Sequence, residues 1–174
     1  MNFRLEELGM QPTAAERQQL AEMLCACVRG GASIGFLAGI TEAEASEYWD
    51  GVLRVAAMGT KVVLVARAEG GVIVGSVQLA LESRRNGRHR AEVQKLMVLP
   101  VLRGRDLGTR LMAEVEALAR SRALRLLFLD TSEEAGGAKA FYEKLGYTYA
   151  GGIPGYAVDP DGTPSKNAIF YKEL

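Results

Sequence analysis

The stretch Val93–Leu118, VQKLMVLPVLRGRDLGTRLMAEVEAL, decides the fold of this chain. Its first apolar run stops at Pro100, a short cationic loop follows at residues 103–105, and apolar residues then recur at helical spacing from Leu107 onward. We therefore expect a strand, a basic glycine-containing loop and a helix, in that order. The unpaired N–H groups of a first helical turn and the positive end of the helix dipole attract anions, so the loop suits a phosphate group.

Strands and helices are expected on both sides of this stretch. Two capping boxes predict the starts of two helices, one formed by Thr13 with Glu16 and the other by Thr41 with Glu44. Apolar runs separated by Glu-Gly-Gly and Asn-Gly turns predict antiparallel strands, and a short apolar run after the central helix predicts a parallel one. The expected helices lie at 13–28, 41–58, 107–122 and between Gly136-Gly137 and Gly146; the expected strands lie at 61–68, 72–81, 91–98, 124–129, 147–151 and 168–171, with residues 3–7 undecided and a loop at 154–165.

This order of elements predicts an α/β (α+β) fold in which a mixed, largely antiparallel central sheet is flanked by helices. A chain of 174 residues is long enough for a real core. We expect a single domain over residues 1–174.

Composition argues against several classes of protein. The net charge is zero, with 21 basic and 21 acidic side chains, so no general attraction to nucleic acid or anionic membrane is expected. No apolar run reaches the roughly 20 residues of a membrane span, and the N-terminus is too charged for a signal peptide. Cys25, Cys27 and one histidine make a poor zinc site. We expect a cytoplasmic protein without a metal, a nucleic-acid partner or a membrane partner.

The densest positive patch is the run at 84–90, which predicts a solvated hairpin turn. It could instead attract an acidic substrate or phosphate groups. Nucleic acid is a weaker alternative, because no aromatic residue is interleaved to stack on bases.

With this order of elements, the chain resembles the GNAT superfamily of acyl-CoA N-acyltransferases over about residues 60–174. The phosphate loop of that family reads Gln/Arg-x-x-Gly-x-Gly/Ala, and the matching positions here are Arg103, Asp106 and Gly108, so Asp replaces the central glycine. The segment FYEKLGY, residues 141–147, is a close match.

Two finer comparisons belong to the same resemblance. The family often has an Asn one turn before the Phe-Tyr pair, where this chain has Ala135. The segments HRAEVQKLMV, LFLDT and IPGYAVDPDG resemble a bacterial subgroup that includes the acetyltransferase giving resistance to the toxin tabtoxin.

The resemblance implies acetyl-CoA as co-substrate and a fold of the GNAT type. Backbone N–H groups of residues 103–108 would hold the coenzyme A pyrophosphate, and the exposed strand backbone at 96–98 would pair with the pantetheine arm, because strands splay apart there in the family. The coenzyme-binding residues so implied are Leu96, Met97, Val98, Arg103, Gly104, Arg105, Asp106, Leu107 and Gly108.

Acetyl transfer to an amine needs a base and benefits from an acid. The resemblance places a general acid for the departing thiolate at Tyr142, which could otherwise be a packed tyrosine. Glu92, at the start of the central strand, and Asp130, at the end of its neighbour, are both candidate bases. Glu92 could instead be an exposed strand carboxylate and Asp130 a turn or cap residue.

We therefore expect an N-acetyltransferase that moves an acetyl group directly from acetyl-CoA to a small or amino-acid-like amine, such as a toxin or antibiotic. Direct transfer is expected because neither cysteine lies in the motif core. Trp49, His89 and Tyr156 are candidate contacts to the acceptor. Trp49 could instead be a core residue, His89 a structural residue and Tyr156 an ordinary loop aromatic. The alternative is an acyl-CoA-binding sensor or partner module without catalysis. The resemblance leaves a homodimer open.

Overall fold

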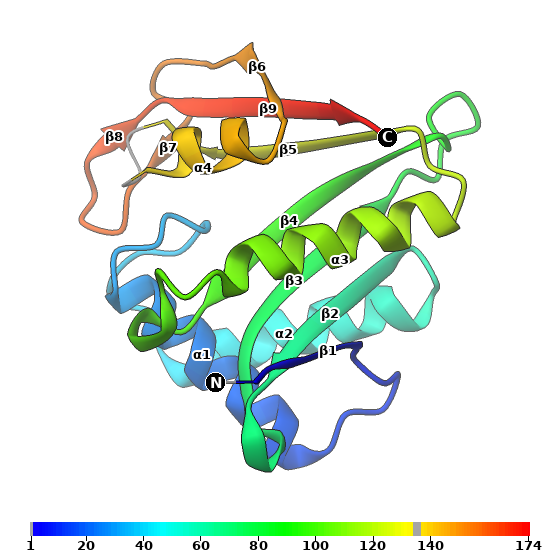
Figure 1. Ribbon diagram of the computed structural model, residues 1–174. Coiled ribbons are helices and arrows are strands. Elements are labelled where there is room, and N and C mark those ends of the chain that lie inside the picture. Colours follow the sequence, from blue (N-terminus) through cyan, green and yellow to red (C-terminus); the bar gives the residue numbers. More distant parts are fainter. Residues whose placement is uncertain (1, 134–136) are drawn as a thin grey trace.

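The computed structural model describes residues 2–133 and 137–174 and contains a seven-stranded sheet with helices on both faces (Figure 1). The helical elements are α1 (Ala14–Arg29), α2 (Glu42–Ala57), η1 (Glu69–Gly71), η2 (Pro100–Leu102), α3 (Leu107–Ser121) and α4 (Ala138–Lys144). The strands are β1 (Arg4–Glu7), β2 (Lys61–Arg67), β3 (Ile73–Leu81), β4 (Arg90–Val98), β5 (Leu126–Ser132), β6 (Thr148–Gly151), β7 (Ala157–Val158), β8 (Pro164–Ser165) and β9 (Asn167–Glu173).

The sheet has the strand order β1-β2-β3-β4-β5-β9-β6, and all of its described pairs are antiparallel except β4 with β5. The predicted mixed, largely antiparallel sheet flanked by helices is confirmed. Residues 3–7, which the sequence left undecided, contain the edge strand β1.

Both predicted capping boxes are formed. The Thr13 hydroxyl accepts from the Glu16 N–H at 3.2 Å, and the Glu16 carboxylate accepts from the Thr13 N–H at 2.7 Å. Thr41 and Glu44 repeat the arrangement at the start of α2. Each pair satisfies two N–H groups that a helix N-terminus otherwise leaves unpaired, so the sequence sets where both helices begin.

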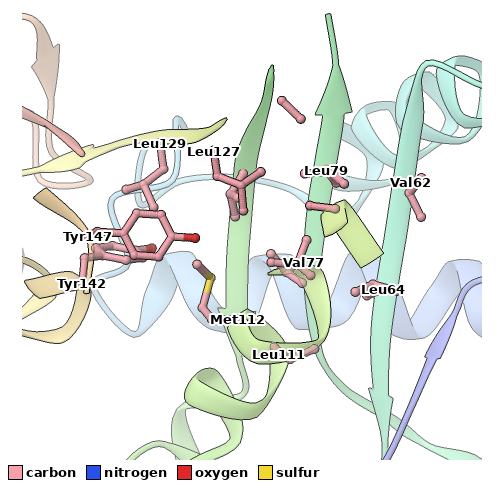
Figure 2. Close-up of a cluster of buried hydrophobic side chains, with 14 of the residues drawn as sticks. Val62, Leu64, Val77, Leu79, Leu111, Met112, Leu127, Leu129, Tyr142 and Tyr147 are labelled. Carbon is pink, nitrogen blue, oxygen red and sulfur yellow. The ribbon is translucent and has the colours of Figure 1, made fainter. Parts of the chain in front are cut away.

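The two faces of the sheet carry separate apolar clusters. Helices α1 and α2 pack on one face, and α3 and α4 cover the other. Figure 2 shows the α3 side, where Leu111 and Met112 meet strand residues such as Val77 and where Tyr142 and Tyr147 lie beside Leu129. Leu111 and Met112 are fully buried, so these helical residues anchor α3 and thereby fix the loop that precedes it.

Strands β4 and β5 run parallel but stay together over a short distance. Their paired positions run from Arg90 with Leu126 to Glu92 with Phe128. Beyond that point the two strands diverge, as Figure 1 shows, and the edge of β4 that faces β5 is no longer covered by a strand. The prediction of a parallel strand after α3 is confirmed, although β5 extends to Ser132 and so includes Asp130.

One sequence expectation about the C-terminal region is wrong. The segment 154–165 was expected to be a plain loop, but β7 and β8 form a two-stranded hairpin within it. The tip of this hairpin contacts the connection between α1 and α2, because the Ala38 N–H donates to the Pro160 carbonyl oxygen at 2.8 Å. Both loops therefore lie over the same end of the sheet.

None of the described helices has the length and apolar character that crossing a membrane requires.

Candidate functional site

A continuous cleft lies where β4 and β5 diverge. It consists of three adjoining hollows of about 240, 470 and 330 Å3. Neighbouring hollows share lining residues: Leu96, Thr131 and Tyr142 between the first and second, and Val98, Arg103 and Phe141 between the second and third. We call the third hollow the α3 end of the cleft and the first hollow, which Asp130 lines, the Asp130 end.

The α3 end is built from the cationic loop and the first turn of α3. Gly104 and Asp106 both have left-handed backbone, with φ of 73° and 62°. This conformation is easy for glycine and tolerable for aspartate, and it turns the chain abruptly into the helix. The N–H groups of residues 107–109 have no acceptor within the helix, so they are available at the mouth of this hollow.

Asp106 is the N-cap residue of α3, but its side chain makes no capping hydrogen bond to the helix. It is exposed, and its left-handed φ is the conformation that the family's glycine would adopt without strain. Arg103 lines the cleft and donates to the Gly30 carbonyl oxygen at 3.0 Å, which ties the loop to the end of α1. Arg105 is exposed and does not line any of the three hollows.

The middle of the cleft runs along the backbone of residues 96–98. The Leu99 N–H donates to Val74 on the β3 side at 3.0 Å. Because successive N–H groups of a strand point to opposite sides, the N–H of Val98 faces the cleft. The Cys27 thiol donates to the Val98 carbonyl oxygen at 3.4 Å. Burial raises the pKa of Cys27, so it stays a thiol.

Tyr142 of α4 lines both the middle and the Asp130 end of the cleft. Its ring packs against those of Phe141, Tyr147 and Phe170, with centroids 5.1–5.9 Å apart. Burial raises the pKa of Tyr142 to about 12, so its hydroxyl remains protonated at neutral pH. Phe141 is only partly buried and lines the cleft beside Gly108, where a Cβ would lie 3.5 Å from its ring.

The Asp130 carboxylate can accept a proton at this end of the cleft. Its Oδ1 accepts from the Asn167 side-chain amide at 2.8 Å, and partial burial raises the pKa of Asp130 above its ordinary value. The Asn167 hydrogen bond and the nearby Lys95 charge oppose that rise. The carboxyl group is open to the cleft and is held in one orientation.

Glu92, the other candidate base, does not line the cleft. Its carboxylate accepts from the Gln94 side chain at 2.7 Å, and Gln94 in turn accepts from Lys61 Nζ at 2.8 Å. Glu92 therefore belongs to a polar network on the α2 face of the sheet. Of the two carboxylates, Asp130 is the one that borders the same hollow as Tyr142.

Two of the three predicted acceptor contacts lie elsewhere. Trp49 is 1% exposed and donates its indole N–H to the Leu20 carbonyl oxygen at 2.8 Å, so it is a core residue and offers no surface to an acceptor. His89 precedes β4, where its carbonyl oxygen accepts from the Arg125 N–H at 2.8 Å, and its turn lies at the end of the sheet far from the start of α3 (Figure 1). Neither residue lines the three hollows of the cleft.

Tyr156, the third predicted contact, lines the Asp130 end and is 55% exposed at its rim. Ala135, where the family often has an Asn, and Gly136, where a helix was predicted to begin, lie outside the described residues.

Several cleft residues were missed in the sequence. Lys95, Ser132, Ser165 and Asn167 all line the Asp130 end. One signal for Lys95 was available, since the alternation of apolar and polar residues in VQKLMV breaks at Lys95, which directly follows the polar Gln94, and such a break is typical of a β-bulge. Asn167 and Ser165 had no comparable signal, because Asn167 reaches the cleft through the pairing of β9 with β5 and Ser165 lies in the short hairpin of β7 with β8.

Comparison with known proteins agrees with this geometry. A family model described as "Acetyltransferase (GNAT) family" matches residues 36–147. The chain therefore belongs to the GNAT family of acetyltransferases, as the phosphate loop and the FYEKLGY segment predicted.

Particular relatives extend the comparison. The chain is 34% identical over 97 residues to an IAA acetyltransferase of Azospirillum brasilense, covering 56% of this chain and 61% of the relative. It is 33% identical over 78 residues to an aminoalkylphosphonate N-acetyltransferase of Salmonella typhimurium, covering 44% and 51%. The chain thus aligns with less than two thirds of the length of these curated relatives.

The fold also matches a solved phosphinothricin acetyltransferase of Sinorhizobium meliloti in complex with acetyl-CoA, with a TM-score of 0.79. The match covers all of this chain and 89% of that protein at 18% sequence identity. At this identity the likeness establishes the fold and not the acceptor.

Proposed function

We propose that this protein transfers an acetyl group from acetyl-CoA directly to the amine of a small acceptor. The observation that carries the proposal is the cleft itself, which joins a helix N-terminus, an uncovered strand edge and a hollow lined by both a carboxylate and a tyrosine. The α3 end has the unpaired N–H groups that a pyrophosphate requires, and the edge of β4 has the length of backbone that a pantetheine arm could pair with. These features fit coenzyme A.

In this proposal the acetyl thioester supplies an electrophilic carbonyl carbon. The residues of the chain position the amine beside that carbon and transfer protons from the amine and to the departing sulfur. Asp130 takes the proton from the ammonium group, which frees the nitrogen lone pair for attack. The new N–C bond forms as the C–S bond breaks, Tyr142 donates its proton to the departing sulfur, and the second proton that the nitrogen loses returns to the Tyr142 oxygen. The Val98 N–H polarises the carbonyl oxygen.

The size of the Asp130 end favours a small acceptor. The Asp130 end has a volume of about 240 Å3, which lies below the roughly 300–1,000 Å3 of pockets for drug-sized ligands. The names of the aminoalkylphosphonate and phosphinothricin enzymes are in keeping with acceptors of this size.

The direct test combines calorimetry with acetyl-CoA and a thiol-release assay over amino acids, polyamines, aminoglycosides, aminoalkylphosphonates and peptide N-termini. Binding together with acceptor-dependent release of coenzyme A is the expected result. Binding without release for every amine would instead favour an acyl-CoA-binding module. No binding of coenzyme A or acetyl-CoA would remove the proposal.

Replacing Asp106 with Gly is expected to tighten coenzyme A binding about fivefold. The change removes a carboxylate beside the proposed pyrophosphate site, and two unit charges about 4 Å apart in water interact by about 1 kcal/mol. It should also stabilise the fold by about 1 kcal/mol, since glycine adopts the left-handed φ without strain. Calorimetry and thermal denaturation measure the two effects.

The matched control for this substitution is Asp106→Asn. It removes the charge but keeps a residue that tolerates the left-handed conformation, so affinity should rise without a matching gain in stability. Equal affinity in the wild type and both variants would show that the Asp106 carboxylate points away from the bound phosphates.

Replacing Asn167 with Asp is expected to move the acidic limb of the kcat/KM profile upward by about one pH unit or more. The Asn167 side-chain oxygen accepts from the Ile153 N–H at 2.7 Å, and aspartate can keep that bond. The variant loses the donor to Asp130 and gains a second negative charge, and both changes raise the pKa of Asp130. A base with a raised pKa is protonated over a wider pH range, so activity is lost at a higher pH. An unchanged limb would argue against Asp130 as the titrating base.

A further inference from the structure

A β-bulge in β4 directs one lysine into the Asp130 end of the cleft. Gln94 pairs with Gln78 and Met97 pairs with Ser76, so Lys95 and Leu96 together oppose Val77. Lys95 has a left-handed φ of 51°, which is uncommon for a residue other than glycine. Bulges of this kind re-aim a side chain at the cost of regular pairing. The bulge therefore gives Lys95 a direction that a regular strand would not give it.

The Lys95 ammonium group is enclosed by neighbouring residues, but no carboxylate pairs with it among the residues that the structure describes. A Cβ built on Gly35 would lie 3.2 Å from Lys95 Nζ, and the Phe36 ring centroid is 5.9 Å away. Among the residues that the structure describes, Lys95 Nζ makes no hydrogen bond and no ion pair. Its burial and the nearby Lys61 charge lower the pKa of Lys95, and the charges of Glu92 and Asp130 oppose that shift. A cation placed in this way gains from an anion that enters the cleft.

Neighbouring lysines do have partners. Lys61 donates to Gln94 at 2.8 Å and to Gln78 at 3.1 Å, and Lys166 pairs with Glu133 at 2.9 Å. Within the described residues these two lysines are therefore paired, whereas Lys95 is not.

Two hydroxyl groups at the same end of the cleft are also without partners. Ser132 and Ser165 are 6% and 2% exposed, and within the described residues neither Oγ atom has a hydrogen-bond partner. A buried hydroxyl group usually has a partner, because leaving it unpaired costs about 1–3 kcal/mol. Both residues line the hollow that also contains Lys95 and Asp130. A ligand with several acceptor oxygens would give Lys95 a counter-charge. The Ser132 and Ser165 oxygens are themselves covered in this structure, so their hydroxyl groups would reach such a ligand by rotation about their Cα–Cβ bonds.

We propose that the acceptor carries an anionic group, a carboxylate, phosphonate or phosphinate, a short distance from its amine, and that Lys95 binds this group. Ser132 and Ser165 donate to its oxygens, while Asp130 receives the amine. The two charges of the acceptor then lie against two protein charges of opposite sign, which fixes the direction in which the amine enters. This inference rests on the proposed acetyl transfer and narrows its substrate class.

The experiment compares matched amines in the thiol-release assay: 2-aminoethylphosphonate with ethanolamine, and L-alanine with L-alaninamide. The wild type should prefer the anionic member of at least one pair by tenfold or more. Lys95→Met should lower kcat/KM for that member roughly 30-fold, mainly through KM, because the anion then lacks its counter-charge. The neutral member should change less than threefold. Lys95→Arg should restore most of the preference.

Lys61→Met is the matched control, since Lys61 is a partly buried lysine on the same face but does not line the Asp130 end. It should leave the preference intact. A wild type that prefers neutral amines, or a Lys95→Met variant that loses activity equally on both members of a pair, would overturn the anion site while leaving acetyl transfer in place.

Calorimetry with 2-aminoethylphosphonate separates failure of this inference from failure of the proposed function. If no amine supports thiol release but the phosphonate binds the wild type and not Lys95→Met, the proposed anion site is supported and the proposed acetyl transfer is overturned. If there is neither release nor binding that depends on Lys95, both are overturned. Thermal denaturation of each variant verifies that it is folded.

Discussion

Asp130→Asn lowers kcat for amine acetylation by an expected 10²- to 10⁴-fold, the usual contribution of a general base. The amide has nearly the same shape, and its oxygen can still accept from Asn167, so the fold and the affinity for acetyl-CoA should be unchanged. What is lost is the group that takes the proton from the ammonium. Steady-state kinetics with a saturating acceptor and calorimetry with acetyl-CoA measure the two expectations.

Glu92→Gln is the matched control for Asp130→Asn. It removes a carboxylate from the neighbouring strand, but that carboxylate lies in the network of Gln94 and Lys61 and not in the cleft. Its effect on kcat should stay below threefold. A loss in Glu92→Gln as large as in Asp130→Asn would move the role of the base to Glu92, through a bridging water.

The second large effect is expected for Tyr142→Phe, which should lower kcat by about 100-fold or more. The variant keeps the ring that packs against Phe141 and Phe170, so stability and coenzyme binding should change little. It removes the proton that the departing sulfur would receive. The loss should be greatest for the chemical step, which single-turnover kinetics isolates.

Tyr147→Phe is the control for Tyr142→Phe. Tyr147 is buried in the same aromatic cluster, with its ring 5.9 Å from that of Tyr142, but it does not line the cleft. Turnover should be unchanged by this substitution. Similar turnover in Tyr142→Phe and the wild type would leave Tyr142 a packing residue.

Most of the fold could be predicted because local chemistry agreed with the final arrangement. The capping boxes at Thr13 and Thr41 set two helix starts, and the apolar spacing from Leu107 set a third. The β7–β8 hairpin could not be predicted, since its strands are two residues each and its pairing is short. Such segments have neither the length nor the alternation that sequence patterns depend on.

The candidate site was predictable where it follows one continuous segment. The loop at 103–108 and the strand before it are neighbours in sequence, so their proximity needs no tertiary information. Asn167 and Lys95 enter the cleft through the pairing of distant strands and through a bulge. Trp49 is buried in the core, a position that the sequence left open because an amphipathic helix does not reveal whether an aromatic side chain faces a cleft or a core.

The hydrogen bond between Ala38 and Pro160 has a consequence for turnover. It joins the two loops above the Asp130 end, and it is the sole backbone hydrogen bond between them among the described residues. One such bond contributes about 0.5–1.5 kcal/mol, a few times the thermal energy at most. The two loops can therefore separate while both apolar cores stay intact. In the proposed reaction such a local opening would let the acetylated product leave the Asp130 end.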